Sequence, residues 1–154
     1  MRRVVALLLT LFVCSCSSEP KRTPPPPPPN PAVEQLSAML GWDKFLPDFL
    51  TIYPGCPDPE LRRALNEKMD DVIRQFIAAA EKDATKEQYL ELLKRSILRF
   101  DRNELDSEEC DRIGDWFERI MDCVGLESSE GALNTWRYGW FLGYFLEHLP
   151  REER

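Results

Sequence analysis

The sequence predicts an all-α domain, a small bundle of four to five helices that follows a signal peptide and a proline-rich tether. Apolar residues after about residue 32 recur with a helical period, and no stretch alternates over the length of a strand. Helix-start signals such as Asp-Pro, and glycines after apolar runs, divide these residues into separate segments. The chain has 154 residues, so the part after the tether is sufficient for one small domain.

The first 15 residues have the layout of a secretory signal peptide. Arg2 and Arg3 give a positive start, and Val4 to Val13 is apolar except for Thr10. This apolar run has roughly half the length of a membrane-spanning helix. We therefore expect export, without a retained transmembrane helix.

The end of the signal, Val13-Cys14-Ser15-Cys16, resembles the lipobox of bacterial lipoproteins. In that motif a small residue precedes the cysteine that receives the lipid and becomes the new N-terminus. The resemblance implies lipidation, palmitate included, at Cys16, because Ser15 is small, whereas Cys14 follows the larger Val13. It also implies attachment to the membrane of the bacterial cell envelope, and Ser17 favours the outer membrane in a Gram-negative host. An ordinary export signal without lipid is the alternative.

Residues 16–32 form the lipidated cysteine and a proline-rich linker in this interpretation. Eight of the 13 prolines lie between Ser17 and Pro31, and Pro24 to Pro29 are consecutive. Consecutive prolines adopt the polyproline II conformation. At ~3.1 Å per residue such a linker could hold the helical domain, residues 33–154, up to roughly 45 Å from the lipid.

The net charge excludes one class of partner. The whole chain has a formal charge of −7, and loss of the first 16 residues leaves 18 basic and 27 acidic side chains, a charge of −9. A domain this acidic is repelled by nucleic acids and by anionic lipid surfaces. We therefore expect no nucleic-acid partner, and membrane contact only through the N-terminal lipid.

The first two helices are predicted from punctuation and periodicity. The first covers Val33–Leu40, and the segment from Asp48 to Pro59 reads as a turn-rich connection. The second starts at Pro59 behind the N-cap residue Asp58 and continues to about Lys82. Its predicted apolar face comprises Leu61, Leu65, Val72, Phe76 and Ala80, with Ala64, Met69, Ile73 and Ile77 beside them.

Three further helices follow. Thr85 and Gln88 form a capping box for the third. The fourth begins at Asp106 or Ser107, has Glu109 at the box position and ends at Gly125. The fifth is predicted from about Gly131 to His148, with Ser128 or Ser129 as its N-cap and Pro150 after it.

The sequence contains no recognisable catalytic or metal-binding motif. The single histidine, His148, has no second histidine to accompany it, and the common hydrolase and phosphate-loop signatures are missing. The acidic turn Asp101–Glu109 departs from a calcium-binding EF-hand loop at Leu105, Asp106 and Arg112. We therefore assign no catalytic residue, no metal ligand and no cofactor, and we favour a protein that is not an enzyme.

The exported domain contains three cysteines, Cys56, Cys110 and Cys123. Cys110 and Cys123 lie on one predicted helix, about 20 Å apart at 1.5 Å per residue, and cannot bond to each other. A disulfide would therefore join Cys56 to Cys110 or Cys123. The alternative is that all three remain reduced as small buried groups.

The end of the chain carries a dense set of aromatic residues. Apolar side chains surround the predicted last helix on every side, which is typical of a buried helix. The alternatives are a surface for a partner protein or an interfacial contact with a membrane, because Trp and Tyr combine an apolar body with a polar tip. The candidate partner-binding residues are Trp136, Tyr138, Trp140 and Tyr144.

Two local motifs carry a resemblance to a known family. The segment Asp58–Asn66, read Asp-Pro-Glu-Leu-Arg-Arg-Ala-Leu-Asn, and the segment Met121–Gly139 resemble an uncharacterised bacterial family of small helical proteins, domain of unknown function 4844. The resemblance covers roughly Phe45 to Tyr138. It implies an all-α fold and a bacterial source, and it implies neither an activity nor any catalytic residue.

These observations favour an envelope lipoprotein that displays a small acidic helical domain. We expect the domain to bind another envelope protein, as an inhibitor or an immunity-like partner would, because this role accounts for both the tether and the aromatic residues. A structural or assembly lipoprotein is the alternative. A hydrolase that uses paired carboxylates ranks third, because the sequence offers no compact set of reactive groups.

Overall fold

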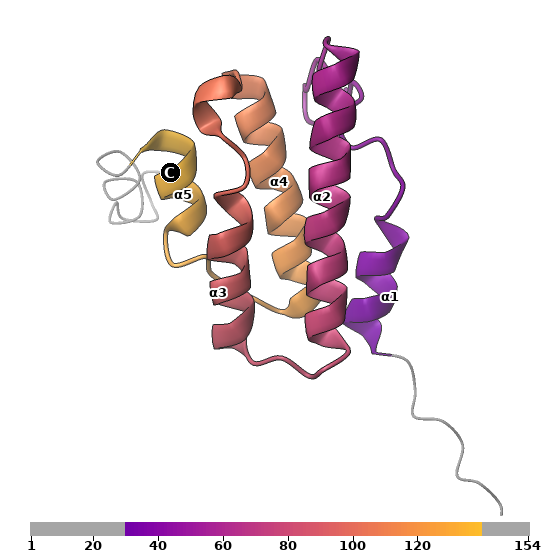
Figure 1. Cartoon of the computed structure of the whole chain (residues 1–154), viewed down its shortest axis with the longest axis vertical. Helices are drawn as coiled ribbons and strands as arrows, with labels where there is room; N and C mark the ends of the chain where they lie inside the picture. The colour runs from indigo at the N-terminus through magenta and orange to yellow at the C-terminus, as the bar shows by residue number, and fades with distance from the viewer. Residues whose placement is uncertain (1–29, 140–154) are drawn as a thin grey trace, which may run out of the picture.

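The structure, a computed structural model, describes residues 30–139. This part of the chain is helical and contains no strand, which confirms the predicted all-α class. The helices α2, α3 and α4 form the body of the bundle, with α1 against α2 on one side and α5 beside α3 and α4 on the other (Figure 1). The elements are α1 Pro31–Ala38, α2 Pro59–Ala80, α3 Lys86–Ile97, the 3-10 helix η1 Arg102–Glu104, α4 Ser107–Val124 and α5 Ala132–Tyr138.

The longest helix, α2, begins as its sequence predicts. The Asp58 carboxylate accepts hydrogen bonds from the amides of Glu60 and Leu61, and Pro59 occupies the first helical position. One face of α2 is buried against the other helices and confirms most of the predicted face, but Leu61 and Ile77 are only partly buried, and the prediction is wrong at Ala64, which is exposed. Its buried members are Leu65, Met69, Val72, Ile73, Phe76 and Ala80.

The first helix begins two residues earlier than the predicted Val33. Asn30 is its N-cap, because the Asn30 side chain accepts a hydrogen bond from the Ala32 amide, and Pro31 occupies the first turn. The Asn30 amide group also donates to the backbone oxygen of Ala80, over 2.9 Å. The tether therefore enters the domain beside the C-terminal end of α2.

Both predicted caps in the middle of the chain are present. Thr85 and Gln88 form a reciprocal capping box at the start of α3. The Asp106 side chain caps α4, and Gly125, with a φ of 65°, ends it in the left-handed conformation that favours glycine. Glu109 lies at the predicted box position, but its side chain is buried among the core residues.

The helix α5 starts where predicted, at about Gly131, but its cap and its end differ from the prediction. Its N-cap residue is Gly131, and no side chain caps the helix. Ser128 instead accepts a hydrogen bond from the Glu130 amide within the preceding loop, so the predicted serine cap is wrong. The helix ends at Tyr138 because Gly139 has a φ of 80°, and the predicted continuation to His148 lies outside the described residues.

The different roles of Thr85 and Ser128 predict different losses of stability when each side chain is replaced by alanine. We expect Thr85→Ala to lower the free energy of unfolding by about 1 kcal/mol, because the substitution removes a helix N-cap. Ser128→Ala should have a smaller effect, because Ser128 caps no helix. Urea denaturation of the two variants would measure the difference, and equal losses would contradict the cap assignment.

Candidate functional site

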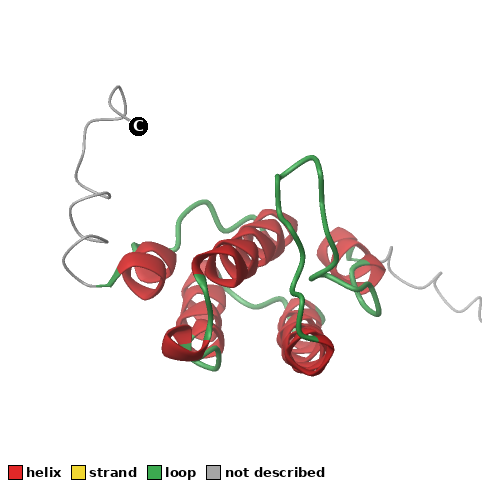
Figure 2. Ribbon diagram, turned by 90° about the horizontal axis from the view of Figure 1, so that it is seen from above, coloured by secondary structure: helices red, strands yellow, loops and turns green. Residues whose placement is uncertain are grey.

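The segment between α1 and α2, Gly41–Cys56, carries five of the seven large apolar side chains that are exposed in the described part; we call it the apolar loop. Three large side chains at its turn, which we call the tip, are almost fully exposed: Phe49 at 95%, Leu50 at 96% and Ile52 at 90%. Trp42 and Leu46 are also exposed. Figure 2 shows this loop projecting beyond the helices. Contiguous exposed apolar surface of this kind commonly marks an interaction site.

The apolar loop is closed by its own backbone. Asp48 and Tyr53 form an antiparallel bridge, with hydrogen bonds of 2.9 and 3.0 Å between their amides and carbonyl oxygens. Below this bridge, the Cys56 amide donates to the Phe45 carbonyl oxygen over 3.0 Å. Ile52 has a φ of 58°, which is an unfavourable conformation for a β-branched residue. The turn at the tip therefore holds a defined but strained conformation.

An arginine on α4 holds the base of the loop. Arg112 Nε donates to the Lys44 carbonyl oxygen over 2.8 Å, and its Nη1 lies 3.0 Å from Asp48 Oδ2. The Trp116 indole also donates to the Lys44 carbonyl oxygen, over 3.2 Å. The Arg112 guanidinium lies 5.1 Å from the centre of the Tyr53 ring. Arg112 is itself buried, so both its charge and the loop carbonyl depend on these contacts.

A lysine attaches the same base to α2. The Lys44 side chain is fully buried, and its Nζ lies 2.5 Å from Asp70 Oδ1 and 3.1 Å from the Trp42 carbonyl oxygen. The Lys44 amide donates to Asn66 on α2 over 2.7 Å. A buried ammonium group needs such a partner, because removing a charge from water is costly. The loop therefore has a charged, buried base and an apolar, exposed tip.

A buried acid lies beneath the loop. Burial, together with a hydrogen bond to the Asp106 carboxyl group, raises the pKa of Glu109 to about 7. The bond to Glu109 in turn lowers the pKa of Asp106. Burial also raises the pKa of the Cys56 thiol beside it. The Tyr53 hydroxyl is buried there without a hydrogen-bond partner among the described residues.

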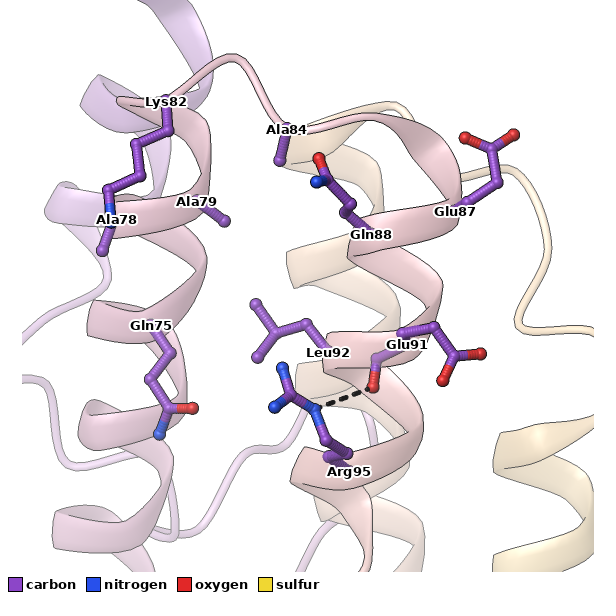
Figure 3. Close-up of a pocket in the computed structure, with 10 residues that line it drawn as sticks. All are labelled: Gln75, Ala78, Ala79, Lys82, Ala84, Glu87, Gln88, Glu91, Leu92 and Arg95. Atoms are coloured by element: carbon purple, nitrogen blue, oxygen red, sulfur yellow. Dashed lines mark hydrogen bonds between the residues drawn. The ribbon is translucent and has the colours of Figure 1, made fainter.

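A separate pocket of about 610 Å³ lies between α2 and α3 (Figure 3). Its floor is formed by Leu92 and small residues, and the carboxylates of Glu87 and Glu91 point away from α2. The Arg95 guanidinium lines the pocket beside Leu92, and its Nε donates to the backbone oxygen of Glu91. The pocket therefore brings no two carboxylates face to face, and its lining residues do not include Glu109. The apolar loop remains the better candidate site.

Comparison with known proteins places this geometry in a family. The family model described as a domain of unknown function, DUF4844, matches residues 26–141. The chain belongs to the DUF4844 family. It is also similar to a DUF3571 family protein from Acinetobacter baumannii, whose crystal structure shares 36% sequence identity with a TM-score of 0.67. That match covers 75% of this chain and 94% of the other, and no curated protein matches. The family predicted from the two motifs is confirmed.

Trp136 and Tyr138, the two candidate partner-binding residues within the described part of the DUF4844 chain, differ in their exposure to solvent. Trp136 is 9% exposed, and its indole donates to the Phe100 carbonyl oxygen over 3.0 Å, so it belongs to the core. Tyr138 is 38% exposed at the end of α5. The other two candidates, Trp140 and Tyr144, lie outside the described residues, as does the predicted lipidation site Cys16.

The three cysteines within the described part of the DUF4844 chain are free thiols. Cys56 and Cys110 are buried and Cys123 is partly buried, and neither candidate disulfide is formed. Residues 30–139 contain no group of three or more His, Cys, Asp or Glu side chains that could hold a metal ion. The buried thiols instead contribute to the core as small apolar groups.

Sequence reasoning missed the apolar loop because it treated the segment as an ordinary connection. Two signals pointed to it. Phe49, Leu50 and Ile52 are unusually apolar for a segment rich in turn residues. Glu109 and Arg112 lie three residues apart on the apolar face of α4, where a charged side chain needs a buried partner.

The contact between Arg112 and the loop should dominate the stability of this region. We expect Arg112→Met to lower the free energy of unfolding by about 3 kcal/mol, because it removes the ion-pair partner of Asp48 and leaves the Lys44 carbonyl with the Trp116 indole as its remaining side-chain donor. Arg119→Met is the control, because Arg119 stacks on Trp116 at 4.8 Å but forms no ion pair with a described residue. Its loss should remain near 1 kcal/mol. Similar losses in denaturant titrations would contradict the anchoring role.

Glu109 should make stability depend on pH. An exposed glutamate has a pKa of 4.5, against about 7 in the folded domain, so the native state retains a proton that the unfolded chain releases between these values. Its stabilising contribution is complete below pH 4.5 and is lost as the pH rises through about 7. This loss should amount to about 3 kcal/mol in the free energy of unfolding.

Glu109→Gln is the matched control for this pH dependence, because glutamine keeps the shape but cannot ionise. Denaturation at a series of pH values should show that the slope above pH 4.5 is absent in this variant. An unchanged slope would assign the pH dependence to another group.

Proposed function

We propose that this protein is a lipid-anchored envelope protein, attached through Cys16, whose DUF4844 domain binds another envelope protein through the tip of the apolar loop. The observation that carries this proposal is the difference in exposure between the tip and the base of one loop. Phe49, Leu50 and Ile52 are each at least 90% exposed, whereas Lys44 and Arg112 at its base are buried and paired. The domain therefore presents the apolar tip to solvent while buried ion pairs hold the base of the loop in place.

The energetics of the tip suit recognition of a partner. Each large apolar side chain gains about 1.5–3 kcal/mol when it is fully removed from water. The bridge between Asp48 and Tyr53 already orders the turn, so binding sacrifices little conformational entropy. A few exposed apolar anchors that fill a pocket commonly provide most of the affinity of a protein interface.

The position of the tip also supports a partner away from the anchoring membrane. The tether enters at Asn30, beside Ala80 at the end of α2, and the apolar loop precedes Pro59 at its start. A helix of 22 residues is about 33 Å long, so loop and tether lie at opposite ends of the bundle (Figure 1). Within residues 30–139, no helix combines the length and apolar character needed to cross a bilayer.

This proposal predicts a site-specific crosslink. A benzophenone amino acid in place of Leu50, in the full-length chain expressed in its native host, should form one discrete protein adduct on irradiation. The same probe in place of Leu98 is the matched control, because Leu98 is 75% exposed but lies at the end of α3. Mass spectrometry would identify the crosslinked peptide. Equal adducts at both positions, or none at position 50, would contradict the proposal.

A further inference from the structure

The exposed face of α4 carries a continuous line of acids beside the apolar loop. These residues recur every three or four positions, so helical geometry places them on one side. All are exposed except Asp115, which is half-buried. We call this line the acidic stripe; its members are Glu108, Asp111, Asp115, Glu118 and Asp122.

The tip and the acidic stripe meet at a small cleft. It has a volume of about 90 Å³ and lies between residues 51–54 of the loop and the side chains of Glu108, Asp111 and Asp115. Arg112 also lines it, but this guanidinium is paired with Asp48. Any protein that covers the tip from this side therefore also faces carboxylates of α4.

The stripe is only partly neutralised. Arg137 on α5 lies 2.5 Å from Asp111 and 3.9 Å from Asp115. The remaining members, Glu108, Glu118 and Asp122, form no ion pair with a residue of the described part. Glu108 lies at the cleft beside the tip, and Glu118 and Asp122 follow further along α4, so the surface that begins at the tip retains a negative charge that an approaching partner must match or overcome.

The area of the tip is too small to form an interface alone. Three large apolar side chains offer about 500 Å², whereas stable complexes bury about 800 Å² on each partner. A partner must therefore extend onto the neighbouring surface, and on the α4 side that surface is the acidic stripe.

We propose that the partner is a basic protein, in which an apolar pocket receives the tip and adjacent Lys or Arg side chains face the acidic stripe. This inference rests on the proposed function and adds the chemistry of the partner. An anionic lipid surface and a second copy of this chain fit less well, because both would place negative charge against the stripe. Charge complementarity of this kind accelerates association and makes it sensitive to salt.

The test uses the benzophenone probe at position 50 in the full-length chain, in isolated native envelopes. One variant combines Glu108→Gln with Glu118→Gln, and its matched control combines Glu34→Gln with Glu81→Gln. All four residues are exposed, both pairs remove two negative charges, and the control pair lies near the tether end of the bundle. Circular dichroism would verify that both variants remain folded.

We expect the stripe variant to form the adduct about tenfold more slowly at low salt, with the deficit shrinking at high salt, and the control to match the unmodified chain. The crosslinked peptide should also lie beside Lys or Arg residues of the partner. If a protein adduct forms at equal rates in both variants, or its peptide lies in an acidic region, the inference is overturned while the proposed function stands. If the probe labels only lipid, only a second copy or nothing, both are overturned.

Discussion

The arrangement of this domain depends on the insertion of one guanidinium group between a helix and a loop. Arg112 brings a guanidinium group with several donors into a buried position on α4, so it requires acceptors, and the loop supplies them through the Lys44 carbonyl and Asp48. Lys44 imposes the same requirement on the other side, where Asp70 of α2 accepts its ammonium group. Movement of the loop away from the bundle would leave two buried charges without partners. The loop is consequently part of the core at its base, although its tip is in water.

This support explains how the fold tolerates an exposed apolar turn. Exposure of Phe49, Leu50 and Ile52 forgoes burial energy, and the positive φ of Ile52 adds backbone strain. Both costs are local, and the buried ion pairs and backbone bridge below the turn offset them. Departures of this kind from ordinary folding rules concentrate at functional sites. The apolar tip and the neighbouring acids of α4 are the observations from which we infer a basic partner.

Local signals accounted for the parts of the fold that were predicted correctly. Asp58 before Pro59, the box formed by Thr85 and Gln88, and Gly125 after α4 each act within one helical turn, so the residues alone identify them. Asn30 before Pro31 carries the same signal, but the preceding prolines placed it in the linker. The cap of α5 was predicted wrongly because two serines offered a plausible N-cap, whereas Gly131 occupies that position without a side-chain cap.

The sequence by itself determined the helical class, the family and the principal helix boundaries of this protein, because these follow from periodicity and short-range hydrogen bonds. The tertiary structure alone decided the candidate site. The contacts of Arg112 and Trp116 with Lys44 join residues 68 and 72 positions apart, and no local pattern specifies which carbonyl a buried donor will find. Trp136 became a core residue for the same reason, since its indole meets a carbonyl 36 positions away. Exposure of the tip likewise follows from how the loop base is held, which only the packed helices establish.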